Sequence, residues 1–301
     1  MENILIGLIP ALGWGFQGTI MQKIGGTSAN KQMGMVLTAL VMAIGIAIFN
    51  PIQWSGNLIA AAAINGIPWA IAQILQNKSF EYLGVSRTMP LTSGEQLVFT
   101  ALVGTICFGE WTSGLQLGLG FGGIVIIIVG TIFTAYTEKA DDAKRSGGDY
   151  VKGLVITTIS SALYVAYATV ARFFEVDSFQ ILLPQALFML AATIVISIFV
   201  SKNEVPGGPL DREQGVFGIK SWQNMLTGVL WSIANIAVLF SNQVNGVAVG
   251  WTLANMNLIF ATLGGLFILH EKKTPKELKS VIIGMVLVAV GGILIGITKA
   301  V

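Results

Sequence analysis

Residues 66–73, Gly-Ile-Pro-Trp-Ala-Ile-Ala-Gln, return 162 positions later as residues 228–235, Gly-Val-Leu-Trp-Ser-Ile-Ala-Asn. At the same offset, and without a gap, further pairs match: Ser79 with Ser241, and Gly84-Val85 with Gly246-Val247. Two apolar segments rich in Gly, Ala and Leu can match by chance. Tryptophan and paired side-chain amides are not low-complexity filler, however, so we interpret the match as an internal duplication.

The duplication continues toward the end of each copy. After one deletion, these residues pair: Glu110-x-x-Ser113 with Glu271-x-x-Thr274, and Gly123 and Gly130 with Gly284 and Gly291. We therefore predict a first repeat over 1–138, a connector over 139–152 and a second repeat over 153–301.

Composition indicates that both repeats lie in a membrane. Of the 301 residues, 54% are apolar and 11% are charged, whereas soluble domains carry about 25% charged residues. A helix needs about 20 mostly apolar residues to cross the hydrocarbon core, and unpaired backbone groups are not tolerated there. Such runs occur at 4–21, 33–49, 58–77, 88–108, 114–136, 153–171, 180–200, 222–241, 247–269 and 280–298. The predicted fold is an all-α integral membrane protein of about ten transmembrane helices.

Because each repeat would contain an odd number of helices, five, the second copy must enter the membrane in the opposite orientation. Inverted repeats are a recurring plan of secondary transporters, in which two similar halves open a midplane site to each side in turn. The predicted architecture is two inverted five-helix repeats, which favours transport.

The basic residues predict the orientation of the chain. When the connections between predicted spans are assigned alternately to two sides, 15 of the 17 Lys and Arg residues fall on one side. Only Arg172 and Lys299 fall on the other. By the positive-inside rule the basic side is cytoplasmic, so we predict a multi-pass protein of the cell membrane with both termini outside the cytoplasm.

Several functional classes are excluded by what the sequence lacks. A net charge of +2 argues against a nucleic-acid partner. One cysteine, Cys107, and one histidine, His270, cannot form a zinc cluster or a nucleophile–histidine pair. No Gly-rich phosphate loop indicates an ATP-binding domain. We therefore expect no enzyme activity, no catalytic residues, no metal and no cofactor on this chain.

The predicted spans carry uncharged polar and aromatic residues that suit a small neutral solute. Amides offer both donors and acceptors, as a polyhydroxylated solute requires, and an aromatic face can cover the C–H side of a sugar ring. The candidate substrate-binding residues are Trp14, Gln17, Asn65, Trp69, Gln73, Gln96, Trp231, Asn235 and Asn255. Other polar residues in the spans include Gln76, Asn77, Tyr164 and Tyr167.

One predicted helical face concentrates these residues. Asn65, Trp69, Gln73 and Gln76 recur at i, i+4, i+8 and i+11, which places them on the same side of a helix. The alternative is that individual amides hold helices together, at about 0.6–2 kcal/mol per hydrogen bond. Tryptophans near predicted helix ends have another interpretation, as interfacial anchors: Trp54, Trp111 and Trp222.

Glu95 is the one ionisable side chain well inside a predicted span. Burying its charge is costly, so an intramembrane acid is a candidate functional group. One interpretation is a proton-coupling site. The other is a structural acid that is protonated, hydrogen-bonded beside Gln96 or facing a watery cavity.

Several segments resemble the glucose/ribose porter family, the bacterial sugar uptake proteins of the drug/metabolite transporter superfamily. These are residues 8–15 (LIPALGWG), 84–90 (GVSRTMP), 96–98 (QLV), 182–186 (LLPQA) and 271–274 (EKKT). The resemblance covers both halves and implies proton-coupled uptake of glucose or ribose by a ten-helix carrier. That family usually has an apolar residue where this chain has Glu95, which argues against a shared proton site there. Arg87, inside the matched GVSRTMP run, is either a gate or a topology anchor.

The leading hypothesis is a secondary transporter that takes up a monosaccharide across the cytoplasmic membrane by alternating access. An exporter of metabolites or drugs could use the same fold, because fold alone does not determine substrate. A membrane sensor could bind sugar without moving it, although the sequence shows no soluble output domain. The expected partners are a small neutral sugar, a proton and the lipid bilayer.

Overall fold

The computed structural model describes residues 2–109, 111–136, 138, 147–177, 179–245, 253–254 and 256–298. Within these ranges the regular structure is helical and no strand occurs. The helices are α1 (Glu2–Ile24), α2 (Ser28–Phe49), α3 (Gly56–Leu83), α4 (Val85–Phe108), α5 (Gly114–Ala135), α7 (Gly147–Phe173), α8 (Leu182–Glu204), α9 (Ile219–Gln223), α10 (Met225–Asn245), α12 (Asn257–Leu263), the π-helix η1 (Gly264–Ile268) and α13 (Pro275–Ile297).

Seven helices in the described part of the chain are long and apolar enough to cross a membrane. They are α2, α3, α4, α5, α8, α13 and the stretch Asp149–Val170 of α7. The protein is therefore an all-α, multi-pass membrane protein. Most of the predicted ninth span, 247–269, is seen as α12 and η1, while residues 246–252 and 255 lie outside the described residues. The count of ten spans stays a prediction.

Three long helices begin at capping boxes, in which two side chains satisfy the free N–H groups of the first turn. The boxes pair Thr27 with Asn30 at α2, Ser113 with Gln116 at α5, and Thr274 with Glu277 at α13. Ser113 and Thr274 are partners in the predicted duplication. These two matched residues thus cap their helices in the same way.

The chain forms two compact units, each described here by itself. Unit 1 comprises Met1–Thr19, Ser79–Ala162 and Ile233–Val301, and unit 2 comprises Ile20–Lys78 and Leu163–Ser232. Helices α1, α3, α7 and α10 contribute residues to both units. Each unit combines segments from both halves of the sequence.

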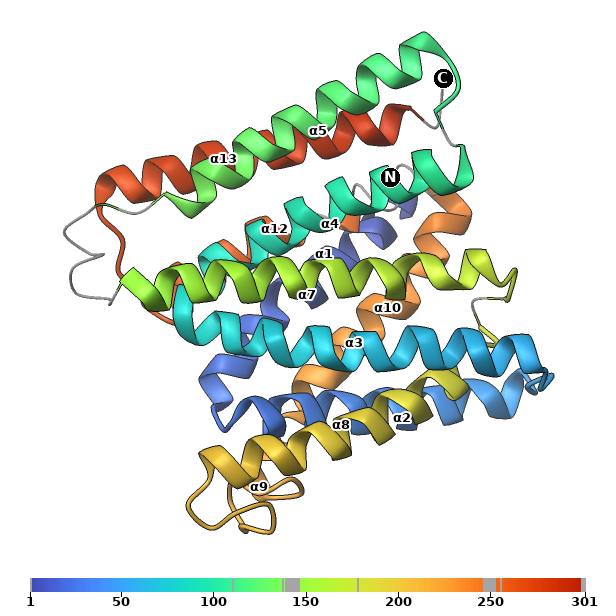
Figure 1. The fold of residues 1–301 in the computed structure, drawn as a ribbon, viewed down its shortest axis with the longest axis vertical. Helices are drawn as coiled ribbons and strands as arrows, with labels where there is room; N and C mark the ends of the chain where they lie inside the picture. The colour runs from blue at the N-terminus through green and yellow to red at the C-terminus, as the bar shows by residue number, and fades with distance from the viewer. Residues whose placement is uncertain are drawn as a thin grey trace. The chain divides into compact units, whose positions relative to one another are not determined.

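In unit 1, α5 and α13 run side by side along most of their length (Figure 1, green and red). Glycines line this contact. A Cβ atom added to Gly123 would lie 2.8 Å from the Gly291 carbonyl oxygen, and one added to Gly130 would lie 2.9 Å from that of Gly284. Small residues of this kind let helix backbones approach closely in a membrane.

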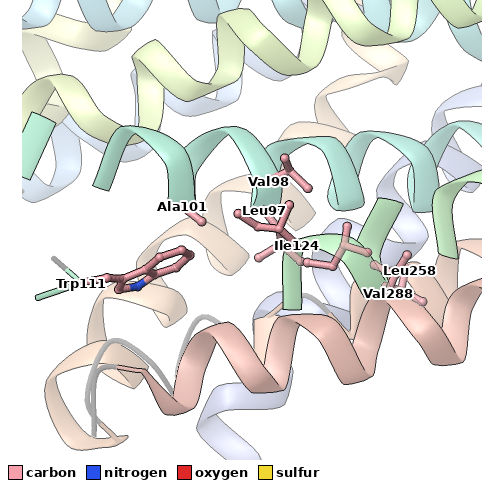
Figure 2. Packing of buried hydrophobic residues seen from close by; sticks show 8 residues of the cluster. Leu97, Val98, Ala101, Trp111, Ile124, Leu258 and Val288 are labelled. Carbon is pink, nitrogen blue, oxygen red and sulfur yellow. The ribbon is translucent and has the colours of Figure 1, made fainter. Parts of the chain in front are cut away.

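A buried apolar cluster fills the space between α4, α5, α12 and α13 (Figure 2). Its members are Leu97, Val98, Ala101, Trp111, Ile124, Ile127, Leu258 and Val288. The interpretation of Trp111 as an interfacial anchor was wrong, because its ring is buried here and meets the Phe121 ring edge-on at 5.6 Å. Trp54 and Trp222 are exposed, as anchors require.

In unit 2, α2 and α8 lie side by side, with α9 against α2 (Figure 1). The buried Gln32 amide of α2 donates to the Ala70 carbonyl oxygen of α3 and to Thr193 Oγ1 of α8, both at 3.2 Å. One amide therefore joins three helices. Gln32 fits the role of interhelical hydrogen bonding that the sequence left open for amides in general.

Candidate solute-binding site

The predicted polar face of α3 is buried inside unit 2. Asn65, Trp69, Gln73 and Gln76 are all buried, and Asn77, one position further, is fully enclosed. Their spacing places them on one side of the helix, over about three turns. The interior of unit 2 therefore contains a run of uncharged polar groups.

A hydrogen-bond network joins three side chains of α3 to Tyr164 of α7. The buried Tyr164 hydroxyl donates to Gln73 Oε1 at 2.7 Å and lies 3.1 Å from Gln76 Oε1. Gln73 Nε2 donates to Asn77 Oδ1 at 3.0 Å and to Gln76 Oε1 at 3.3 Å. Asn77 Nδ2 in turn donates to the Ser28 carbonyl oxygen at 3.4 Å. The three amides are thus joined by hydrogen bonds to one another and to the start of α2.

Two tryptophans meet one helical turn from this network. The ring centroids of Trp69 on α3 and Trp231 on α10 are 5.1 Å apart, and the ring planes are inclined by 60°. Both side chains are buried, at 1% and 8% exposure. Tilted aromatic pairs at this separation are attractive beyond the area that they bury.

Asn65 has one free hydrogen-bonding atom. Its Nδ2 donates to the Tyr167 carbonyl oxygen at 2.8 Å, which ties α3 to α7. Its Oδ1 is buried and accepts no hydrogen bond from the described residues. A buried acceptor of this kind is costly to leave unpaired, so it is available to a donor hydroxyl.

The predicted site residues divide between the two units. Unit 2 holds Asn65, Trp69, Gln73 and Trp231, and Trp69 meets Trp231 directly. The remaining described candidates lie in unit 1: Trp14 and Gln17 on α1, Gln96 on α4, and Asn235 on α10. Asn255 lies outside the described residues.

Glu95 belongs to unit 1 and is partly buried on α4. The Thr158 hydroxyl of α7 donates to Glu95 Oε1 at 2.7 Å. Its second oxygen, Oε2, is buried and accepts no hydrogen bond from the described residues. The Thr158 hydrogen bond is compatible with both interpretations of Glu95, the proton-coupling site and the structural acid.

Arg87 forms a buried ion pair near the start of α4. Its Nη2 lies 2.9 Å from Glu277 Oε1 of α13, with side-chain exposures of 3% and 0%. The Glu138 backbone N–H donates to the same oxygen at 3.1 Å. Side-chain hydrogen bonds with Thr274 and then Lys276 lower the pKa of the nearby Glu138 carboxyl. The sequence singled out Arg87 as a gate or a topology anchor, but it did not predict the ion pair with Glu277.

Glu271 binds the first turn of the same helix. Its carboxylate accepts from the Val85 N–H at 2.6 Å and the Ser86 N–H at 3.2 Å, and also from the Ser86 hydroxyl. An anion at a helix N-terminus is favoured by the free N–H groups and the helix dipole. Gly84 has a φ of +79°, and a Cβ there would lie 2.9 Å from Glu271 Oε1. In the Gly-Val-Ser-Arg run, Gly84 leaves room for the Glu271 carboxylate, and Val85 and Ser86 donate hydrogen bonds to it. Arg87 pairs with Glu277.

Sequence reasoning did not assign Tyr164, Glu271 or Glu277 to any contact. Tyr164 was visible as a polar residue in a span, and Glu271 as part of the duplicated Glu-x-x-Ser/Thr pattern. Their partners on other helices lie 88 or more positions away. No periodicity along a single helix connects residues so far apart.

These features define a class of protein. A multi-pass helical membrane protein with a buried, uncharged amide network and paired tryptophans is built like a carrier of a small polar solute. The comparison with known proteins identifies the family. Residues 5–298 match the family model described as "Sugar transport protein", and the chain belongs to this family.

Relatives span the full length of the chain. A protein of Listeria monocytogenes named as a sugar uptake protein is 40% identical over 298 residues, covering 99% of this chain and 100% of its own. A protein of Latilactobacillus sakei named as a ribose uptake protein is 38% identical, with 96% of each chain covered. One of Priestia megaterium, named as a glucose uptake protein, is 33% identical over 99% of this chain and all of its own.

A solved crystal structure of a protein has a similar fold, with a TM-score of 0.61. The match covers 98% of this chain and 96% of that one at 12% sequence identity. At this identity the likeness concerns the fold alone.

Proposed function

We propose that the protein takes up a monosaccharide, glucose or ribose, by alternating access between two inverted repeats. Membership of the sugar transport family and the names of the relatives support this substrate class. The observation that carries the proposal is the amide network of Gln73, Gln76 and Asn77 beside the Trp69–Trp231 pair. Uncharged donors and acceptors next to an aromatic surface match the chemistry of a sugar.

The α5–α13 contact supports the inverted repeats. In the duplication, Gly123 corresponds to Gly284 and Gly130 to Gly291. Exchanging the copies converts the Gly123–Gly291 contact into the Gly284–Gly130 contact, and both occur. A contact surface that maps onto itself when its halves are exchanged is the signature of two-fold symmetry.

Unit 2 offers a second argument for the same symmetry. Gly66 of α3 packs on α8, where an added Cβ would lie 2.7 Å from the Gln185 carbonyl oxygen. Its counterpart Gly228 of α10 packs on α2, with an added Cβ 2.9 Å from Met35 Cα. Helix α2 and helix α8 are each the second helix of their proposed repeat. The two glycines thus make equivalent contacts with exchanged partners.

The remaining roles belong to the same proposal. The repeats are residues 1–138 and 153–301, joined by a cytoplasmic connector at 139–152, with both termini outside. Trp14, Gln17, Gln96, Asn235 and Asn255 are further proposed substrate-binding residues. Glu95 would carry the coupled proton. Arg87, through its ion pair with Glu277, would act either as a gate at one end of the pathway or as a topology anchor.

Transport by purified protein in proteoliposomes tests this function. Labelled glucose or ribose should accumulate inside when an inward proton gradient is imposed, and a gradient of the opposite sign should not drive it. Efflux of unrelated cations without sugar flux would favour an exporter. Saturable sugar binding without flux would indicate a sensor. Tags at both termini should be accessible from outside intact cells.

A further inference from the structure

Two carboxylates hold the first turn of α4 in unit 1. Glu271, from the connection between η1 and α13, accepts hydrogen bonds from the Val85 N–H and from Ser86. Glu277, in the first turn of α13, lies 2.9 Å from Arg87 Nη2, and both side chains of this ion pair are buried. Both acids belong to the second proposed repeat, whereas α4 belongs to the first. The two contacts therefore join one copy of the duplication to the other.

The elements of the Glu271 contact occur in each copy of the sequence. Glu271 corresponds to Glu110, and Gly84-Val85 corresponds to Gly246-Val247. Exchanging the copies therefore pairs a second acid with a second segment of the same sequence. The Glu271 contact follows the duplication.

The ion pair does not follow the duplication. Glu277 and Gln116 are the third residues of the capping boxes at α13 and α5, so they occupy equivalent positions, and glutamine carries no charge. At the offset of 162, Arg87 corresponds to Val249. The sequence contains no Lys or Arg over 221–271, so a shift of the alignment supplies no basic counterpart either. The exchanged version of this contact therefore cannot contain an ion pair.

We propose that the Arg87–Glu277 pair makes the two end states of the carrier unequal and favours the state that faces outward. This inference rests on the proposed function, alternating access between inverted repeats. If the two repeats were identical, exchanging them would convert the inward-facing state into the outward-facing one, and both would have the same free energy. A preference for one state can arise only where the copies differ. The charge pattern assigns Arg87 and Glu277 to the predicted cytoplasmic end, so their pair holds that end together.

Opening the cytoplasmic end separates two charges that are buried together. A hydrogen bond between charged groups is stronger than one between neutral groups, so its loss disfavours the inward-facing state. At the outer end the equivalent Gln116 has no charge to separate. The pair sets which state predominates, while the direction of net uptake still follows the gradients.

The KM for sugar at each face reports this preference. A binding site that is exposed at one face for only a fraction of the time has an apparent affinity at that face reduced by the same fraction. The measurement uses labelled glucose or ribose in vesicles of defined orientation without a proton gradient. We expect the wild-type KM at the cytoplasmic face to be at least about fivefold higher than at the outer face.

The double variant Arg87→Val/Glu277→Gln introduces the residues of the equivalent positions. Its ratio of the two KM values should move at least about threefold toward equality. Arg87→Lys keeps a positive charge beside Glu277, so its ratio should stay within about twofold of wild type even if the double variant folds poorly. Lys276→Ala is the control at the same end, because Lys276 is 79% exposed in its pair with Glu138. It should leave the ratio unchanged.

Three results would overturn the inference. They are equal KM values at the two faces of wild type, an unchanged ratio in the double variant, and a loss of the ratio in Arg87→Lys as complete as in the double variant. If wild type carried no sugar across the membrane, the proposed function would fail instead.

Discussion

The indole rings of Trp69 and Trp231 meet with their centroids 5.1 Å apart, although 162 positions separate them in the chain. They occupy equivalent positions in the duplicated sequence. Exchanging the two copies therefore converts this contact into itself. If the proposed inverted repeats are related by a two-fold axis, a residue that touches its own equivalent lies on that axis.

Removing either ring should impair transport. We expect Trp69→Ala and Trp231→Ala each to reduce sugar uptake at least about tenfold, because each loses an aromatic pair and a large buried surface. Uptake kinetics at matched membrane levels measure the effect. Trp54→Ala is the control, since Trp54 is 57% exposed. Wild-type kinetics in both site variants would remove the tryptophans from the site.

The Gln73 amide should matter for transport more than for stability. Gln73→Ala removes the acceptor 2.7 Å from the Tyr164 hydroxyl and the donor to Asn77 Oδ1, and we expect uptake to be lost while membrane levels stay normal. Gln32→Ala offers a contrast, because Gln32 joins α2 to α3 and α8. It should lower the unfolding temperature, through a loss of about 0.6–2 kcal/mol per hydrogen bond. If the two variants changed sugar uptake and the unfolding temperature by the same amounts, Gln73 would have no role in transport separate from stability.

Breaking the buried ion pair should destabilise the protein strongly. Arg87→Ala leaves the Glu277 charge buried without its partner, which costs about 3–5 kcal/mol in comparable cases. Lys276→Ala is the control, because Lys276 is 79% exposed and its pair with Glu138, at 3.2 Å, should contribute less than about 1 kcal/mol. Thermal unfolding of the purified variants in detergent measures both.

The double variant Arg87→Gln/Glu277→Gln separates a gate from an anchor. It removes both charges, so most of the stability lost in Arg87→Ala should return. If the pair closes the pathway, the double variant should still leak sugar down its gradient faster than wild type. Normal stability together with normal flux would leave Arg87 without a gating role.

The glycine contact between α5 and α13 should not tolerate larger residues. A Cβ on Gly284 would lie 2.6 Å from the Gly130 carbonyl oxygen, so Gly284→Leu should force the helices apart and reduce the amount of folded protein. Gly122→Leu on α5 is the matched control, because no atom lies within 4 Å of its added Cβ. Equal yields of both variants after membrane extraction would argue against the contact.

Glu95→Gln tests proton coupling with little change in shape. Glutamine keeps an acceptor for the Thr158 hydroxyl, which now donates to Glu95 at 2.7 Å. If Glu95 carries the proton, gradient-driven accumulation should disappear while sugar exchange without a gradient persists. Accumulation at the wild-type level would end the coupling role of Glu95.

Part of the candidate site could be predicted because it lies along one helix. The spacing of Asn65, Trp69, Gln73 and Gln76 places them on one face of α3 whatever surrounds it, and the structure buries that face. The Gly84–Arg87 run was recognisable as a motif, but its purpose was not. Glu271 and Glu277, which bind it, come from the connection between η1 and α13 and from the first turn of α13.

The sequence by itself determined that the apolar segments are helices, because a backbone in lipid has no water to bind and must pair its hydrogen bonds within each helix. Tertiary structure alone decided that Trp69 meets Trp231, that Tyr164 meets Gln73, and that Trp111 is buried. These outcomes depend on which helix faces approach and how closely. Side-chain volumes of several helices set that together, and no single segment carries the information.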